Sequence, residues 1–247
     1  MAHDGAAIEE VAMDARIDDT IIEAAGISDG AWAAPRLAAP YPHHLAADHL
    51  LPNGTALRTR PISPQDRRRH WRFLCSLSLH TRYQRLMSAR GLLPGELRRM
   101  VEIDYQREMA LVAIADVDGE ERILAVARYV RDAADDGSGG LAPAAEFAIV
   151  VADAWQRRGI GSLILQRLRQ IARDAGVRQL AGLTLATNRQ MIALARRLGF
   201  EVSHEQDDWT VKRVTWRLED EADGGDAADV ARGQERRKDA SPVIRAQ

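Results

Sequence analysis

Residues 145–175 read AEFAIVVADAWQRRGIGSLILQRLRQIARDA and carry the clearest structural pattern in the sequence. Residues 145–151 form an apolar run, typical of a buried strand, that Glu146 interrupts. Residues 161–175 place Leu and Ile at helical spacing, which predicts an amphipathic helix. The stretch therefore predicts a strand, a short loop and a helix in direct succession.

The loop of this unit, residues 156–162, has the composition of an anion site. The first amides of a helix lack intrahelical partners and lie at its positive end. Gly159 and Gly161 let the backbone approach a phosphate closely, and Arg157 and Arg158 add positive charge. The loop fits a pyrophosphate, although it matches neither a P-loop nor a dinucleotide fingerprint. Taken alone, Gln-x-x-Gly-x-Gly is more often an ordinary turn between a strand and a helix, so the rest of the chain has to decide.

Further strands and helices flank this unit on both sides. Short apolar or alternating runs predict strands at 55–60, 109–117, 123–130, 145–151, 180–185 and, as a final pair, 202–218. Helical spacing and capping residues predict helices after Ser63, at 80–87, from Pro94 to near 103, at 161–175 and at 189–198. This order predicts an α/β or α+β fold, with helices on both faces of one mixed sheet.

The ordered domain is expected to span residues 55–218. Residues 1–54 are rich in Ala and Pro, and we expect a flexible N-terminal extension there. Residues 219–247 offer charge, Gly and Ala but few groups to bury, which predicts a disordered charged tail.

Composition excludes several classes of protein. The 247 residues carry a formal net charge of -2, without the basic excess that general nucleic-acid binding needs. Cys75 is the only cysteine, so the chain forms no intrachain disulfide and no Cys-rich zinc site. His43, His44 and His49 lie in the Pro-rich extension without supporting ligands, so we expect no metal. The sequence shows neither a secretory signal nor an apolar run of about 18 residues, which predicts a cytoplasmic protein without membrane contact.

The order of the elements resembles the GNAT superfamily of N-acetyltransferases. The resemblance rests on residues 57–62 as a first strand, the Asp118-Gly119 hairpin, the loop at 156–162, and Asn188 before a helix that ends in Leu198-Gly199-Phe200. It implies the GNAT fold, whose mixed, mostly antiparallel sheet is splayed at its centre between the fourth and fifth strands.

The same resemblance implies where an acyl donor binds. Acetyl-CoA would lie in the splay, with its pantetheine arm paired to backbone near Ile149 and Val151. Asn188 would bond the pantetheine arm, although Asn is also a favoured N-cap and both roles can hold. The pyrophosphate would bind Gln156, Arg157, Arg158, Gly159, Ile160, Gly161 and Ser162.

Several segments also look like the acetyltransferase domain of bacterial Pat-type protein lysine acetyltransferases. These segments are residues 57–66, 78–83, 103–110, 125–129 and 145–148. The resemblance implies that the acceptor is a protein lysine, with acyl-CoA synthetases among the candidate partners. Several such proteins carry a regulatory or synthetase-like domain, for which we expect 54 residues to be too few. A small amine acceptor and a non-catalytic acyl-CoA-binding module remain alternatives, and the oligomeric state stays open.

Glu146 is the candidate general base. A lysine ammonium has a reference pKa near 10.4, so a base has to remove its proton before the nitrogen can attack. Glu146 places a carboxylate in an otherwise apolar strand, and the Pat-type resemblance puts the catalytic glutamate at this position. The alternative is a strand-edge glutamate paired with Arg128. Many GNAT enzymes have a Tyr acid where this sequence has Ala195, so we expect water to protonate the thiolate, with Tyr105 and Tyr129 as weaker candidates.

Overall fold

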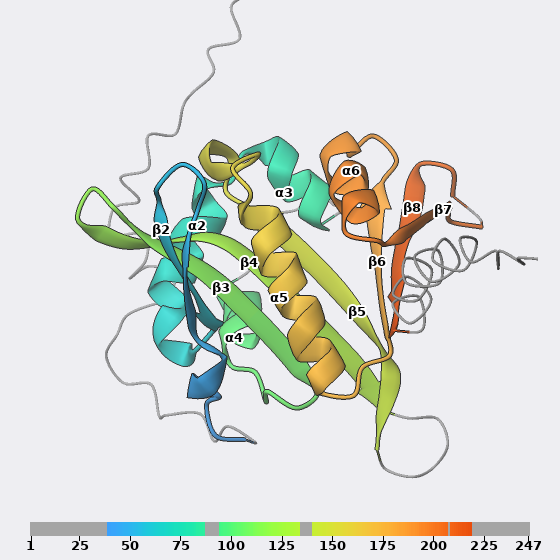
Figure 1. The fold of residues 1–247 in the computed structure, drawn as a ribbon, viewed down its shortest axis with the longest axis horizontal. Helices are drawn as coiled ribbons and strands as arrows, with labels where there is room; N and C mark the ends of the chain where they lie inside the picture. Colours follow the sequence, from blue (N-terminus) through green and yellow to red (C-terminus); the bar gives the residue numbers. More distant parts are fainter. Residues whose placement is uncertain (1–38, 87–93, 134–139, 207, 219–247) are drawn as a thin grey trace, which may run out of the picture.

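An eight-stranded mixed sheet forms the centre of the protein (Figure 1). The computed structural model describes residues 39–86, 94–133, 140–206 and 208–218. The strand order is β1-β2-β3-β4-β5-β6-β8-β7, and every neighbouring pair is antiparallel except β5 with β6. The predicted mixed, mostly antiparallel sheet is therefore confirmed.

The elements follow the predicted order. The strands are β1 Ala47–Leu50, β2 Ala56–Pro61, β3 Glu108–Val117, β4 Glu120–Ala133, β5 Leu141–Val151, β6 Gln179–Leu185, β7 Glu201–His204 and β8 Val211–Arg217. The α-helices are α2 Arg67–Ser76, α3 Leu79–Leu86, α4 Pro94–Val101, α5 Ile160–Asp174 and α6 Arg189–Arg197, and the 3-10 turns are η1 His43–Leu45, η2 Pro64–Asp66 and η3 Asp153–Trp155. No helix among the described residues is long and apolar enough to cross a bilayer.

Helices cover both faces of the central strands. Figure 1 shows α5 across one face, with α2 and α4 on the other. The apolar stripe of α5 is buried, at Ile160, Ile164, Leu165, Leu168, Ile171 and Ala172. β3 is buried at seven consecutive positions because it has a helix layer on each side.

The ordered sheet begins earlier than the sequence predicts. β1 pairs with β2 from Ala47 opposite Thr59 to Leu50 opposite Ala56, within the segment expected to be flexible. β1 is a short edge strand with alternating exposure, so its sequence carries little apolar signal. Residues 1–38 and 219–247, which hold the rest of the predicted extension and the predicted tail, lie outside the described residues.

The sheet splits between β5 and β6. These parallel strands share three residue pairs, which end at Glu146 opposite Ala181, and beyond that point the two strands no longer pair with each other. Figure 1 shows them diverging toward α3 and α6. A Cβ on Gly182 would lie 2.8 Å from the carbonyl oxygen of Phe147, so a residue without a side chain is needed where the fork opens. The predicted splay between the fourth and fifth predicted strands is therefore confirmed.

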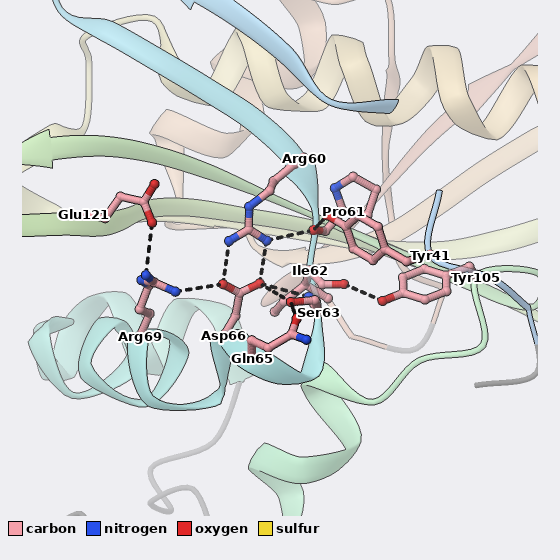
Figure 2. A network of polar contacts seen from close by, with 10 residues as sticks. All are labelled: Tyr41, Arg60, Pro61, Ile62, Ser63, Gln65, Asp66, Arg69, Tyr105 and Glu121. Carbon is pink, nitrogen blue, oxygen red and sulfur yellow. Dashed lines mark hydrogen bonds and ion pairs between the residues drawn. The ribbon is translucent and has the colours of Figure 1, made fainter. Parts of the chain in front are cut away.

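A saturated polar network fixes the turn from β2 into α2 (Figure 2). The Asp66 side chain is fully buried and accepts two hydrogen bonds from the Arg60 guanidinium, each 2.6 Å long. It also accepts the Ser63 N–H at 2.9 Å, which completes the predicted capping box. The hydroxyl of Tyr105 donates to the Ile62 carbonyl at 2.8 Å. Each of these buried groups has a partner, so the network serves to hold the fold.

Candidate active site

A cavity of about 570 Å³ opens where β5 and β6 part. Its walls come from β5, β6, the loop at 156–162, α3 and α6. This volume lies within the range that small-molecule sites occupy, and a fork between strands offers unpaired backbone groups along both walls. The cavity can therefore hold an extended ligand alongside β5.

The loop at one end of the cavity presents free backbone amides. Within the described part of the chain, the N–H groups of residues 157–162 have no hydrogen-bond acceptor. Arg157 (φ 59°) and Gly159 (φ 90°) adopt left-handed conformations. These turns bring the chain into α5 with its first amides directed outward, at the positive end of the helix. The arrangement is a cradle for an anion such as a pyrophosphate.

Most of the predicted donor-site residues line this cavity. They are Ile149, Val151, Gln156, Arg157, Gly159, Gly161, Ser162 and Asn188. Two predicted side chains point elsewhere. The guanidinium of Arg158 lies over the ring of Trp155, 4.9 Å from its centroid, and the side chain of Ile160 is fully buried in the core. Ile160 could therefore contribute its backbone N–H alone.

Asn188 has the structural role that its residue type predicts. Its side-chain oxygen accepts the N–H of Met191 at 3.0 Å and caps α6. The capping role is confirmed, and the residue also lines the cavity.

Glu146 lies at the other end of the cavity, at the last paired position before the fork. Its side chain is exposed. Arg128 does not pair with it, because the Arg128 guanidinium binds Glu108 at 2.9 Å and lies opposite Ala148 in the sheet. The alternative of a Glu146–Arg128 pair is therefore wrong, and the Glu146 carboxylate remains available to a ligand.

Arg85 is a charged neighbour of Glu146. Burial, together with repulsion from Arg128, lowers the pKa of the Arg85 guanidinium to about 10, and attraction to Glu146 opposes that shift. Arg85 also lines the cavity.

The weaker candidates for chemistry belong to the scaffold. Tyr129 is 1% exposed, and burial raises its pKa to about 12. Tyr105 donates to a backbone carbonyl, and its pKa is also raised, chiefly by burial. Burial likewise raises the pKa of the Cys75 thiol. None of the three lines the cavity, and among the described residues no three His, Cys, Asp or Glu side chains gather as a metal-ligand group.

Several cavity residues carried no sequence signal. Gln84 comes from α3, Gly182 from β6, and Leu194 and Arg197 from α6. The Arg197 guanidinium donates to the Ser162 hydroxyl at 2.6 Å, which adds positive charge beside the anion cradle. The positions of these residues depend on how α3 and α6 pack against the sheet, and no local sequence pattern predicts that packing.

Comparisons with known proteins agree with this geometry. The profile of the acetyltransferase (GNAT) family matches residues 88–200. The chain is 33% identical over 161 residues to the Pseudomonas aeruginosa acetyltransferase PA5475, covering 65% of this chain and 83% of that protein. It is 32% identical over 140 residues to the acetyltransferase Pat of Mycolicibacterium smegmatis, covering 57% of this chain and 40% of that protein.

Among solved structures, the GNAT domain of S. lividans PAT is similar over its whole length. The match has a TM-score of 0.62 and 29% sequence identity, and covers 72% of this chain.

Proposed function

The chain belongs to the acetyltransferase (GNAT) family and is an N-acetyltransferase, and we propose that it transfers the acetyl group of acetyl-CoA to a protein lysine, with Glu146 as the general base. One observation carries the proposal: a single cavity joins the anion cradle at 157–162 to the carboxylate of Glu146.

The spacing of the two ends fits an extended acyl donor. Glu146 and Val151 are five residues apart on one strand, which corresponds to about 17 Å of extended chain. The amides of the loop, with Arg157 and Arg197, would hold the pyrophosphate, and the unpaired edge of β5 would hold the arm. When bound, acetyl-CoA supplies an acetyl thioester that a neutral amine can attack.

Glu146 would prepare the amine. Its carboxylate would accept one proton from the lysine ammonium at the closed end of the fork, where β5 and β6 last pair, so that the nitrogen lone pair becomes free to attack. The new C–N bond would replace the C–S bond, the nitrogen would lose its second proton to water as the amide forms, and the departing thiolate would take a proton from water.

Similarity to Pat proteins supports the proposal of a protein acceptor. Pat of Mycolicibacterium smegmatis and the S. lividans PAT domain are similar to this chain, and the Pat-type segments noted above include the strand with Glu146. On the basis of this resemblance, we propose an acyl-CoA synthetase as the partner protein. The observation that favours a protein over a small amine is that Glu146 is exposed at the point where β5 and β6 stop pairing.

The test is acetyl-lysine formation on purified acyl-CoA synthetase and on a broad protein panel, read by mass spectrometry. Glu146→Gln should lower kcat by about 10²- to 10⁴-fold and leave CoA binding intact. Glu120→Gln is the matched control, since Glu120 is an exposed glutamate at the start of β4, bound to Arg72 and outside the cavity.

Full activity of Glu146→Gln would show that another group is the base. Thiol release with small amines, and no acetylation across the protein panel, would show that the acceptor is a small molecule.

A further inference from the structure

Asp153 ties the donor loop to helix α3. It follows β5 at the start of η3, three residues before Gln156. Its carboxylate accepts the N–H of Ser78 at 2.9 Å and the hydroxyls of Ser78 and Thr81, each at 2.7 Å. Partial burial alone would raise the pKa of Asp153, but these hydrogen bonds hold it below its usual value, so the carboxylate is charged at neutral pH.

Gln156 adds a second link between the same two elements. Its side-chain amide donates to the hydroxyl of Thr81 at 3.3 Å and to the Val151 carbonyl at 3.2 Å. Thr81 is therefore shared, because it donates to Asp153 and accepts from Gln156. Both links begin in the segment that turns from β5 into the anion cradle.

These polar links matter because α3 has little other anchorage. Among the α3 side chains that the structure describes, Thr81 is buried and Arg82, Gln84 and Arg85 are partly buried, whereas the apolar Leu79 and the aromatic Tyr83 are 76% and 45% exposed. A helix with so few buried apolar contacts is held chiefly by its hydrogen bonds. Ser78 serves as its N-cap by accepting the N–H of Thr81 at 3.1 Å.

The helix that is held in this way forms one wall of the cavity. Gln84 and Arg85 lie one turn beyond Thr81 and line the space beside Glu146. Any shift of the loop would reach Thr81 through Asp153 and Gln156, and would move Gln84 and Arg85 with the rest of the helix.

We propose that Asp153 is a positioning residue that couples occupancy of the donor loop to the placement of α3, so that donor binding orders the wall where the acceptor amine arrives. The inference rests on the proposed donor site. Coupling of this kind is reciprocal for binding: a donor that orders α3 strengthens acceptor binding by the same factor that the acceptor strengthens donor binding.

Hydrogen exchange with free coenzyme A as the probe tests the coupling without any acceptor. Saturating CoA should slow exchange in α3 about 10-fold in the wild type, together with exchange in the loop. In Asp153→Ala, CoA should still protect the loop at 157–162 but should no longer protect α3. Thr81→Val should give the same loss, and the double variant should lose no more than either single variant.

Asp104→Ala is the matched control for a purely structural effect. Asp104 accepts three backbone N–H groups, at 2.9, 2.7 and 3.1 Å, and lies outside the cavity. Its loss should lower stability while CoA still protects α3. Protection of α3 that persists in Asp153→Ala, or that is missing in the wild type while the loop is protected, would overturn the inference. Failure of CoA to bind at all would overturn the donor site itself, and the inference with it.

Discussion

Two polar regions of the molecule lie where a strand turns into a helix. They differ in whether their polar groups have hydrogen-bond partners within the protein. Around Asp66, the buried carboxylate accepts from Arg60 and from the Ser63 N–H (Figure 2). At residues 157–162, the amides of the described loop have no acceptor. A saturated network can only hold structure, whereas an unsaturated one is prepared for a ligand. The difference separates scaffold from site better than charge does, since both regions are rich in arginine.

The largest expected effect is a loss of stability when the hydrogen-bonded network around Asp66 is broken. Asp66→Asn leaves the Arg60 guanidinium without its carboxylate in a setting where the Arg60 side chain is 20% exposed. We expect the free energy of unfolding to fall by about 3–5 kcal/mol. Chemical denaturation measures it, and CoA affinity of the folded variant should be unchanged.

Asp48→Asn is the control for that variant. Asp48 and Arg58 form an exposed ion pair at 3.7 Å, so its loss should leave stability unchanged within error. Equal effects of the two substitutions would contradict the contrast between the buried and the exposed pair.

A pH-dependent change in stability, of intermediate size, is expected from the buried side chain of His70. The ring is 3% exposed, its Nδ1 has no partner in the described structure, and burial with repulsion from Arg128 lowers its pKa to about 3. The unfolded chain takes up a proton below its reference pKa near 6.5, and the folded chain does not, so stability is lost as the pH falls. Between pH 6.5 and pH 5 the loss is about 2 kcal/mol.

Denaturation at several pH values compares the wild type with His70→Met. The variant should lose this part of the acid slope, while His44→Gln, an exposed histidine, should keep it. An unchanged slope in His70→Met would mean that His70 does not carry the effect.

On the unsaturated side, Gly159→Ala should weaken donor binding with little loss of stability. A Cβ there would meet nothing within 4 Å, but φ is +90°, and an L-residue is strained at that angle by about 1–2 kcal/mol. The loop would relax away from its cradle geometry, and CoA affinity measured by calorimetry should fall about 5- to 30-fold.

Gly119→Ala provides the matched control, because Gly119 has φ +80° and open space around it, in the β3–β4 hairpin. It should be strained to a similar degree without any change in CoA affinity. Unaltered affinity in Gly159→Ala would show that the loop does not need its left-handed turn.

The smallest expected effect is that of Arg157→Gln. Removal of one exposed charge beside the cradle should weaken CoA binding about 2- to 5-fold, and the difference should shrink as salt is added. Arg158→Gln should have less effect, since Arg158 rests on Trp155. A larger loss of CoA affinity in Arg158→Gln than in Arg157→Gln would show that Arg158, and not Arg157, contacts the bound anion.

The sequence predicts those parts of the site whose residues lie close together in one continuous segment. Gly159, the apolar strand and the amphipathic helix lie within 31 consecutive residues, so their periodicity predicts the cradle and its position. Glu146 is visible because it breaks an apolar run. The splay was expected from resemblance to a family, not from a residue pattern.

The remaining parts depend on packing between distant segments. Asp153 lies in the predicted loop, but its partners Ser78 and Thr81 are 75 and 72 residues away. Arg197 enters the site because α6 docks beside Ser162, and Gly182 matters because Phe147 approaches it. The four residues of β1 carry little sequence signal because a short edge strand needs few apolar side chains.

The fork has a consequence for how the protein comes apart. Only three residue pairs join β5 to β6, so the sheet consists of a five-strand unit and a three-strand unit with a weak seam between them. The smaller unit is therefore the natural candidate for subglobal unfolding. A donor bound in the fork, as proposed, would contact both units and stabilise them against separation. Removal of that donor would therefore make the smaller unit easier to unfold on its own.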